Sequence, residues 1–198
     1  MPDRIPEYRR AVRAAVRGVW TGALNQPQGV AALGDGVKRY FRLAFYEGAK
    51  ECGILPDEMT TPEKTKLSNR IQYEFTFMKG FIVVVREGRK GSENAKPLAQ
   101  FFRRAEMWVN RYTELRDLGK MLACGDRKMM WVWHPEKEHC DSCRRLNGKV
   151  KRASQWEAAR AQGIYPQSPA LKCGGYKCGC ELKPTDEPMS KGRLPSIS

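Results

Sequence analysis

The sequence is poor in histidine, has no long apolar run and shows no internal repeat. Its two histidines, His134 and His139, lie in one short stretch. The longest purely apolar run, Phe81 to Val85, is far shorter than the roughly 20 residues that cross a bilayer. Residues 4–17 interleave arginines with apolar residues, unlike a secretory signal. These absences argue against a membrane-spanning protein, a secreted protein, a solenoid and an enzyme that uses several histidines.

Positive charge is in clear excess. The chain has 36 basic and 22 acidic side chains, a net charge of +14, and the basic residues are spread along its whole length. Such an excess favours contact with nucleic acid or with an acidic protein surface, through attraction and counterion release. The alternative is a soluble basic protein whose charges simply face water. A hydrophobic fraction of 41% and a charged fraction of 29% are typical of a folded protein.

Apolar side chains at steps of three and four predict four amphipathic helices in the first part of the chain. Their expected ranges are 7–24, 37–52, 61–85 and 97–123. The stretch 25–29 should end the first helix, and the glycines around Asp35 leave the start of the second uncertain. Thr61-Pro62-Glu63 is the clearest start signal, with Thr61 as the N-cap. The run 81–85 is β-prone and could be extended instead.

The pattern changes after Gly125. Residues 129–133 and 148–151 read as short strands, and Ser154 with Glu157 forms a capping box that should open a helix ending at Gly163. The predicted fold is therefore mainly α, with an N-terminal helical bundle followed by a small zinc-stabilised α+β module. Its expected parts are a helical domain at 1–125, a cysteine-rich module at 126–184 and an extended C-terminal arm at 185–198.

Five of the seven cysteines lie close together near the C-terminus and indicate a structural zinc site. Cys140 and Cys143 form a CxxC pair, whose two-residue gap lets both thiolates reach one ion. Tetrahedral zinc needs four ligands, so the site should use four of the five: Cys140, Cys143, Cys173, Cys178 and Cys180. Cys178 is favoured from the second group, with either Cys173 or Cys180.

Other interpretations of the cysteines remain open. The five could form disulfides or be inert thiols, and His139 could replace one thiolate as a ligand. Cys52 and Cys124 lie on predicted helices among apolar neighbours and are expected to be core residues.

The enzyme interpretations are weaker. His134-Pro135-Glu136 followed by the CxxC pair superficially resembles a zinc-deaminase signature, but that chemistry places its two halves on separate helices, and here both fall in one loop. A histidine-metal nuclease needs more ligands than two neighbouring histidines supply. An all-thiolate site leaves no open position for water, so no enzymatic activity is expected.

Basic residues of the first helix, of the loop after residue 87 and of the cysteine module are candidate contacts for nucleic acid or a protein partner. They are Arg9, Arg13, Arg17, Arg89, Lys90, Arg144, Arg145, Lys149, Lys151 and Arg152.

Several motifs, taken in order, resemble the head-morphogenesis or minor head proteins of tailed phages, including the Mu F-like group. Arg104-Ala105-Glu106 and Arg111-Tyr112-Thr113-Glu114 are similar to the family's RAE…RTE helix. The segment 140–150 is similar to its CxxCxxLxGxV pattern, and 178–182 to its terminal CRCxL. The family often has His-Pro before that last motif, where this chain has Cys173, which would then take the histidine's place on the metal.

The resemblance implies a structural protein of the virion head, present in the host cytoplasm during assembly and without a membrane role. It implies the portal or the major capsid protein as partners, and packaged DNA as a further contact. The alternative, of a different class, is a nucleic-acid-binding protein without sequence specificity that uses a zinc ribbon and basic helices.

Overall fold

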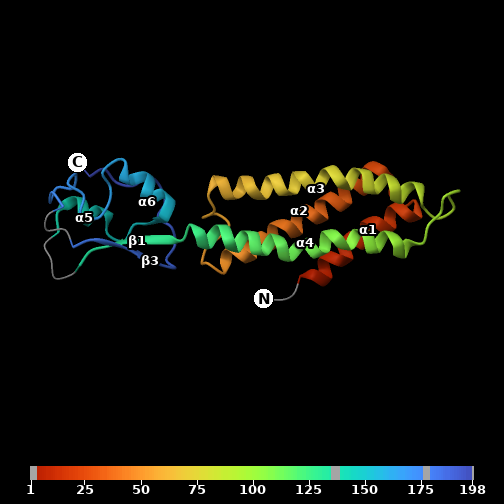
Figure 1. The fold of residues 1–198 in the computed structure, drawn as a ribbon, viewed down its shortest axis with the longest axis horizontal. Helices are drawn as coiled ribbons and strands as arrows, with labels where there is room; N and C mark the ends of the chain where they lie inside the picture. Colours follow the sequence, from red (N-terminus) through yellow and green to blue (C-terminus); the bar gives the residue numbers. More distant parts are fainter. Residues whose placement is uncertain (1–3, 135–138, 176–178, 198) are drawn as a thin grey trace. The chain divides into compact units, whose positions relative to one another are not determined.

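The computed structural model describes residues 4–134, 139–175 and 179–197. The chain forms two compact units (Figure 1). The helical unit comprises Met1–Glu51 and Met59–Leu122, and the cysteine-rich unit comprises Cys52–Glu58 and Ala123–Ser198. The predicted fold class is confirmed, because the protein is mainly helical and carries one small sheet.

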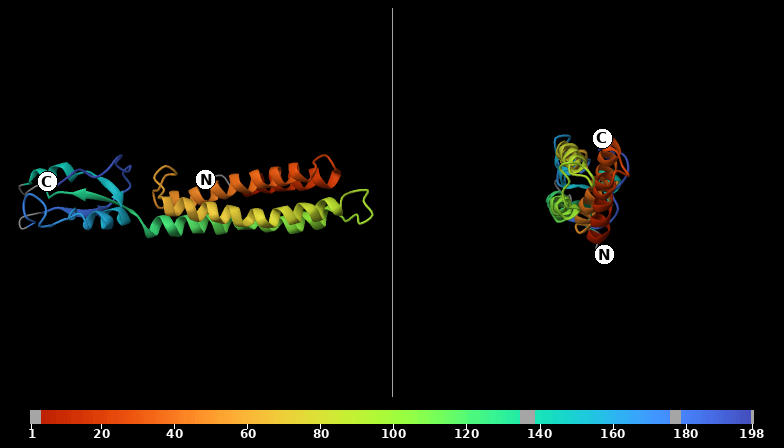
Figure 2. Two further views of the ribbon diagram at one scale, coloured as in Figure 1. Left: turned by 90° about the horizontal axis from the view of Figure 1, so that it is seen from above. Right: turned by 90° about the vertical axis from the view of Figure 1, so that its right-hand side faces the viewer.

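Four helices build the helical unit: α1 (Ile5–Thr21), α2 (Gln26–Lys50), α3 (Thr61–Glu87) and α4 (Leu98–Gly125). They run alongside one another, as Figure 2 shows. Each turns its apolar stripe inward, and the largest fully buried side chains include Tyr8, Phe41, Phe45, Ile82 and Trp108. The arginines of α1 lie on its outer face, as its periodicity predicts.

The start of α2 was left uncertain, with residues 34–36 as a turn or a weak N-terminus, and the helix in fact begins earlier, at Gln26. Asn25 is the N-cap: Gln28 N donates to Asn25 Oδ1 (3.0 Å), and Asn25 N donates to Gln28 Oε1 (2.9 Å). Gly29 and Gly34 lie inside the helix at tight contacts. A Cβ at Gly29 would stand 2.2 Å from Val19 Cγ2, and one at Gly34 would stand 2.6 Å from the Phe75 ring. Glycine here serves close packing.

Smaller corrections apply to α1 and α3. α1 ends at Thr21 with Gly22 in the left-handed conformation, so Leu24 lies beyond it. Thr60, rather than Thr61, caps α3, and its amide donates to Glu63 Oε2 (2.7 Å). The run 81–85 is helical and largely buried, so the extended alternative is wrong.

Helices α2 and α4 approach each other through two glycines. A Cβ at Gly48 would stand 1.8 Å from the carbonyl oxygen of Arg116, and one at Gly119 would stand 2.1 Å from that of Phe45. Both obstacles are backbone atoms, which cannot rotate away. The spacing between α2 and α4 therefore depends on the absence of side chains at these positions.

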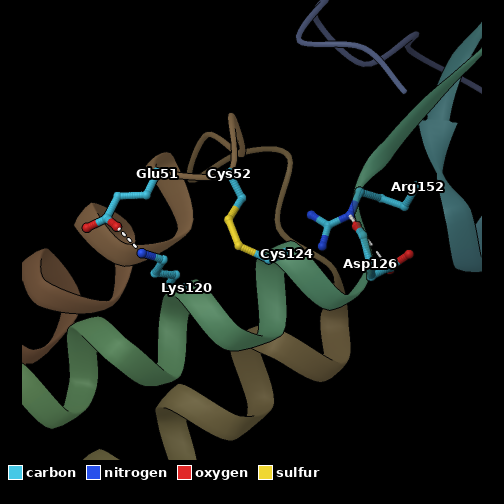
Figure 3. The surroundings of a disulfide bond; sticks show 6 residues. All are labelled: Glu51, Cys52, Lys120, Cys124, Asp126 and Arg152. Carbon is cyan, nitrogen blue, oxygen red and sulfur yellow. Dashed lines mark hydrogen bonds and ion pairs between the residues drawn. A yellow bond between two sulfur atoms is a disulfide. The ribbon is translucent and has the colours of Figure 1, made fainter. Parts of the chain in front are cut away.

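Charged side chains link the four helices. Glu106 of α4 accepts from Arg9 Nε of α1 (2.6 Å), and Glu47 of α2 accepts from Tyr112 Oη of α4 (2.7 Å). The fully buried Glu74 of α3 accepts from Trp108 Nε1 (3.1 Å) and from Arg111 of α4. At the far end of α2, Glu51 pairs with Lys120 (2.9 Å; Figure 3).

The cysteine-rich unit contains a three-stranded antiparallel sheet in the order β2-β1-β3. Its elements are β1 (Lys128–Val132), α5 (Asp141–Leu146), β2 (Val150–Arg152), α6 (Ala153–Arg160) and β3 (Glu181–Pro184). The register pairs Met130 with Val150 on one side and with Lys183 on the other. α5 and β3 had no counterpart among the expected elements.

The start of α6 differs from the expected capping box. Ser154 lies in its first turn, and its amide and hydroxyl donate to the Asp126 carboxylate (2.8 and 2.6 Å). Asp126 also pairs with the fully buried Arg152 (3.6 Å; Figure 3). The acceptor for the first turn thus comes from a distant residue, which a local motif cannot reveal.

Residues 185–197 are irregular but packed. Ser190 Oγ accepts from Val150 N (3.0 Å), and Lys151 Nζ donates to the carbonyls of Ser190 and Gly192 (both 2.7 Å). Leu194 and Ile197 contact the core around Trp131, Leu146 and Trp156. This segment therefore belongs to the unit as a strap across it.

The segment 52–58 is held in the cysteine-rich unit by a disulfide and by a buried carboxylate. Cys52 and Cys124 are disulfide-bonded, with a Cα–Cα distance of 5.3 Å (Figure 3). Cys52 is half-buried and Cys124 is exposed, so their prediction as core residues was wrong. Glu58 accepts from the amides of Leu55 and Met189 (2.9 Å each) and pairs with the buried Lys128 (3.4 Å).

Gly119→Ala should lower the free energy of unfolding by about 3 kcal/mol, because the new methyl group meets backbone that must move. Gly80→Ala on α3 is the matched control, since a Cβ there meets nothing within 4 Å. It should raise that free energy by about 0.5–1 kcal/mol through helix propensity. Urea unfolding measures both. Equal effects would show that the α2–α4 approach is not tight.

Glu58→Gln should destabilise the cysteine-rich unit by about 2 kcal/mol at neutral pH. Burial raises the pKa of Glu58, but the two amides and Lys128 outweigh it and leave the pKa below its ordinary 4.5. The ionised carboxylate therefore stabilises the fold above pH 4.5, and this stabilisation is lost as pH falls through the lowered pKa. The difference between wild type and variant should shrink in acid, followed by urea unfolding across pH. Asp57→Asn, at an exposed neighbour, should change stability by less than about 0.5 kcal/mol.

Candidate metal centre

Three cysteines from two segments bring their sulfur atoms together. Cys140 directly precedes α5 and Cys143 lies in its first turn, so the CxxC spacing places their Sγ atoms 3.5 Å apart. Cys173 approaches from the turn 171–174, and the three sulfurs lie within 4.8 Å of one another. Cys143 is buried, while Cys140 and Cys173 are half-buried. The group can hold a metal ion.

The buried Ser142, between the two CxxC cysteines, links the segments of the site. Its hydroxyl donates to the carbonyl of Ile197 (2.8 Å) and accepts from the amide of Lys172 (3.3 Å), next to Cys173. Outside, Lys172 Nζ pairs with Asp141 (3.2 Å). The turn that carries Cys173 is thus fixed against α5 from both sides.

The surroundings favour the thiolate of Cys140. Burial raises its pKa, but hydrogen bonds from the amides and thiols of Cys143 and Cys173 outweigh burial and lower the pKa to about 7. A thiolate, rather than a thiol, binds a metal ion. Cys140 can therefore lose its proton and bind a metal ion near neutral pH.

The other predicted ligands have different outcomes. Cys180 is buried in the core of the unit and does not belong to the close sulfur group. Cys178 lies outside the described residues. Cys173, one of two alternatives expected beside Cys178, is the member of the second group that joins Cys140 and Cys143.

The histidines lie outside the sulfur group. The ring of His139 stacks on Trp133, with 4.6 Å between ring centroids, and its Nε2 lies 2.8 Å from the carbonyl oxygen of His134. His139 therefore does not replace a thiolate within the described sulfur group. Glu136, which completes the deaminase-like motif, lies outside the described residues.

Some of the predicted contact residues already interact with other side chains of the fold, some are exposed and two are buried. Arg9 and Arg13 pair with Glu106, and Arg17 lies over the Phe102 ring. Arg89, Lys90, Arg144 and Arg145 are exposed, and Lys149 is half-buried. Lys151 and Arg152 are buried, so their prediction as surface contacts was wrong: one bonds to the C-terminal strap and the other to Asp126.

Sequence reasoning missed Ser142 as the residue that holds the site together. It lies inside the CxxC motif, so its position was visible, but its partners at 172 and 197 are set by the tertiary fold. The sequence shows only that a short polar residue stands between the two cysteines; the structure shows that this residue is fully buried.

No protein-family model, curated protein or solved structure matches this chain. Within the described residues, no helix combines the length and apolar character that crossing a membrane requires.

The purified protein should contain about one metal ion per chain, and Cys143→Ser and Cys173→Ser should each lose most of it, because each removes one of three gathered ligands. Elemental analysis of the purified variants measures this. Cys124→Ser removes a cysteine outside the sulfur group and should retain the metal. Equal metal content in all four proteins would contradict a metal centre at these sulfurs.

Proposed function

We propose that the sulfur group holds a structural Zn²⁺ ion. Zinc binds thiolates with bonds of about 2.3 Å in a tetrahedron, so neighbouring ligand sulfurs stand about 3.8 Å apart. The 3.5 Å between Cys140 and Cys143 supports this geometry. The fourth ligand comes from Cys178 or Cys180, the remaining cysteines of the cluster. Replacing each by serine in turn and measuring bound zinc identifies it.

A zinc ion with four thiolate ligands supports the fold and has no open position for a substrate or water. The ion would join α5, the turn 171–174 and, through Ser142, the C-terminal end. A unit with three short strands and two short helices gains most from such a cross-link. The proposed role of the centre is therefore to make the unit rigid enough to serve as a protein-binding module.

The protein acts, in this proposal, as a minor structural protein of a tailed-phage head. The observation that supports this proposal is that the motif residues make structural contacts within the fold. In the RAE…RTE helix, Glu106 pairs with Arg9, Arg111 with Glu74, and Glu114 with Arg70 (3.2 Å).

The residues of the CxxCxxLxGxV segment also have structural roles. Leu146 and Val150 are buried in the cysteine-rich unit, and Gly148 takes a left-handed conformation at the turn between them. These motif residues build a framework rather than a reaction centre. That supports assembly by surface complementarity, with the portal or the major capsid protein as partner.

The test uses a phage that encodes this chain. Deleting its gene should give heads with altered protein composition or reduced DNA content, and mass spectrometry should detect the chain in wild-type heads. Complementation with Cys143→Ser should restore head assembly only weakly, because the unit loses its zinc. Complementation with Asp57→Asn, a change at an exposed residue outside the sulfur group, should restore it well.

Heads assembled without the chain that keep normal composition and DNA content would overturn the proposed function. Zinc measured in the purified protein is a separate result, so the metal centre and the role in head assembly can fail independently.

A further inference from the structure

An open hollow of about 430 Å³ lies between α2 and α3 and is lined by basic and polar side chains. Its rim carries Lys38, Arg42 and Tyr46 from α2 and Lys64, Ser68 and Gln72 from α3. The side chains of Leu67 and Ile71 are buried beneath it. Three cations from two helices thus converge on one depression with hydrogen-bonding groups beside them.

The hollow continues along α2 toward the start of that helix, and a further hollow flanks it over the same stretch of α2. One neighbouring hollow of about 400 Å³ shares Phe75 and adds Lys79, and another of about 350 Å³ shares Lys38 and Arg42 and adds Arg39. Together the three form a groove, here called the α2–α3 groove. Its lining includes six cations, Arg4, Lys38, Arg39, Arg42, Lys64 and Lys79, and one carboxylate, Asp35.

The central cations of the groove have no acidic partners. Within the described part of the chain, no ion pair involves Lys38, Arg42 or Lys64, and all three are exposed. The arginines of α1 differ, because Arg9 and Arg13 are already paired with Glu106. The centre of the groove therefore concentrates positive charge that the fold itself does not neutralise, whereas Arg4 at its edge is paired with Glu47 (2.9 Å).

The length of the groove fits a linear polyanion better than a single small anion. Its lining runs from Gln26 to Tyr46 along α2, which is about 30 Å at 1.5 Å per residue. At 3.4 Å of duplex axis per phosphate of one strand, that length matches roughly nine phosphates. Tyr46 and Phe75, both half-buried in the groove, also offer ring faces on which bases can stack.

We propose that the α2–α3 groove binds the phosphodiester backbone of a nucleic acid. Lys38, Arg42 and Lys64 replace counterions along the strand, and Ser68 and Gln72 donate hydrogen bonds to phosphate oxygens. The contacts reach the backbone, so recognition does not depend on base sequence. The proposal rests on the helical unit alone and does not depend on the metal centre or on a role in head assembly.

The experiment measures binding of the full-length, metal-loaded protein to fluorescein-labelled DNA by anisotropy over a series of salt concentrations. A variant with Lys38→Ala, Arg42→Ala and Lys64→Ala should bind at least about tenfold more weakly at low salt. Its plot of log affinity against log salt should be shallower by about 3, because each lost phosphate contact removes about 0.9 from the slope. Duplex and single-stranded probes of one sequence distinguish the two sources of this backbone.

The matched control carries Arg10→Ala, Lys96→Ala and Arg103→Ala, three exposed basic residues outside the groove, and so loses the same charge. Its affinity should stay within about twofold of wild type, since its charges are remote from the bound strand. Asp35→Asn removes the one carboxylate from the groove lining and should strengthen binding about twofold. It keeps the proposal testable if the groove variant fails to fold.

Equal losses in the groove variant and the control variant would overturn the proposal, because binding would then follow net charge alone. Tighter binding of poly-glutamate than of DNA would also overturn it and would indicate an acidic protein partner. Weaker rather than stronger binding by Asp35→Asn would count against the groove as the site.

Discussion

The close approach of three sulfur atoms, all within 4.8 Å of one another, is the interaction around which the cysteine-rich unit is arranged. As thiolates they would repel one another strongly in a partly buried place, and as thiols they would form only weak hydrogen bonds. A bound cation removes both difficulties. The chain satisfies the geometry by bringing together α5, the turn 171–174 and the C-terminal strap, all linked through Ser142. Much of this unit's architecture serves that convergence.

Periodicity predicted which parts of the chain are helical, because buried stripes repeat at the spacing of a helix. It failed at the start of α2, because a glycine can either end a helix or allow a neighbouring helix to pack closely against it. Only the tertiary structure shows that Gly29 and Gly34 do the second. β3 was missed because Glu181–Pro184 is short and mostly exposed, without a buried face to mark it.

The metal centre was predictable in part. A CxxC pair is local, so Cys140 and Cys143 could be assigned from spacing alone. The choice of Cys173 depends on how the turn 171–174 folds, and the pairing of Cys52 with Cys124 depends on residues 72 positions apart. Neither follows from composition or pattern. Charge likewise could be counted from the sequence, but which cations have partners became visible only in the folded helical unit.

The division of the chain has a consequence for how the protein is made. Glu58 lies 70 residues before Lys128, its buried partner, and all of α3 and α4 comes between them. At a synthesis rate of about 5–20 residues per second, the ribosome takes several seconds or more to reach the second partner. The cysteine-rich unit cannot be completed during that interval, whereas the helices of the other unit can already begin to pair. Because the chain is synthesised from its N-terminus, the helical unit can begin to fold first. A piece of the chain that begins after residue 122 would lack Cys52 and also Glu58, the buried partner of Lys128.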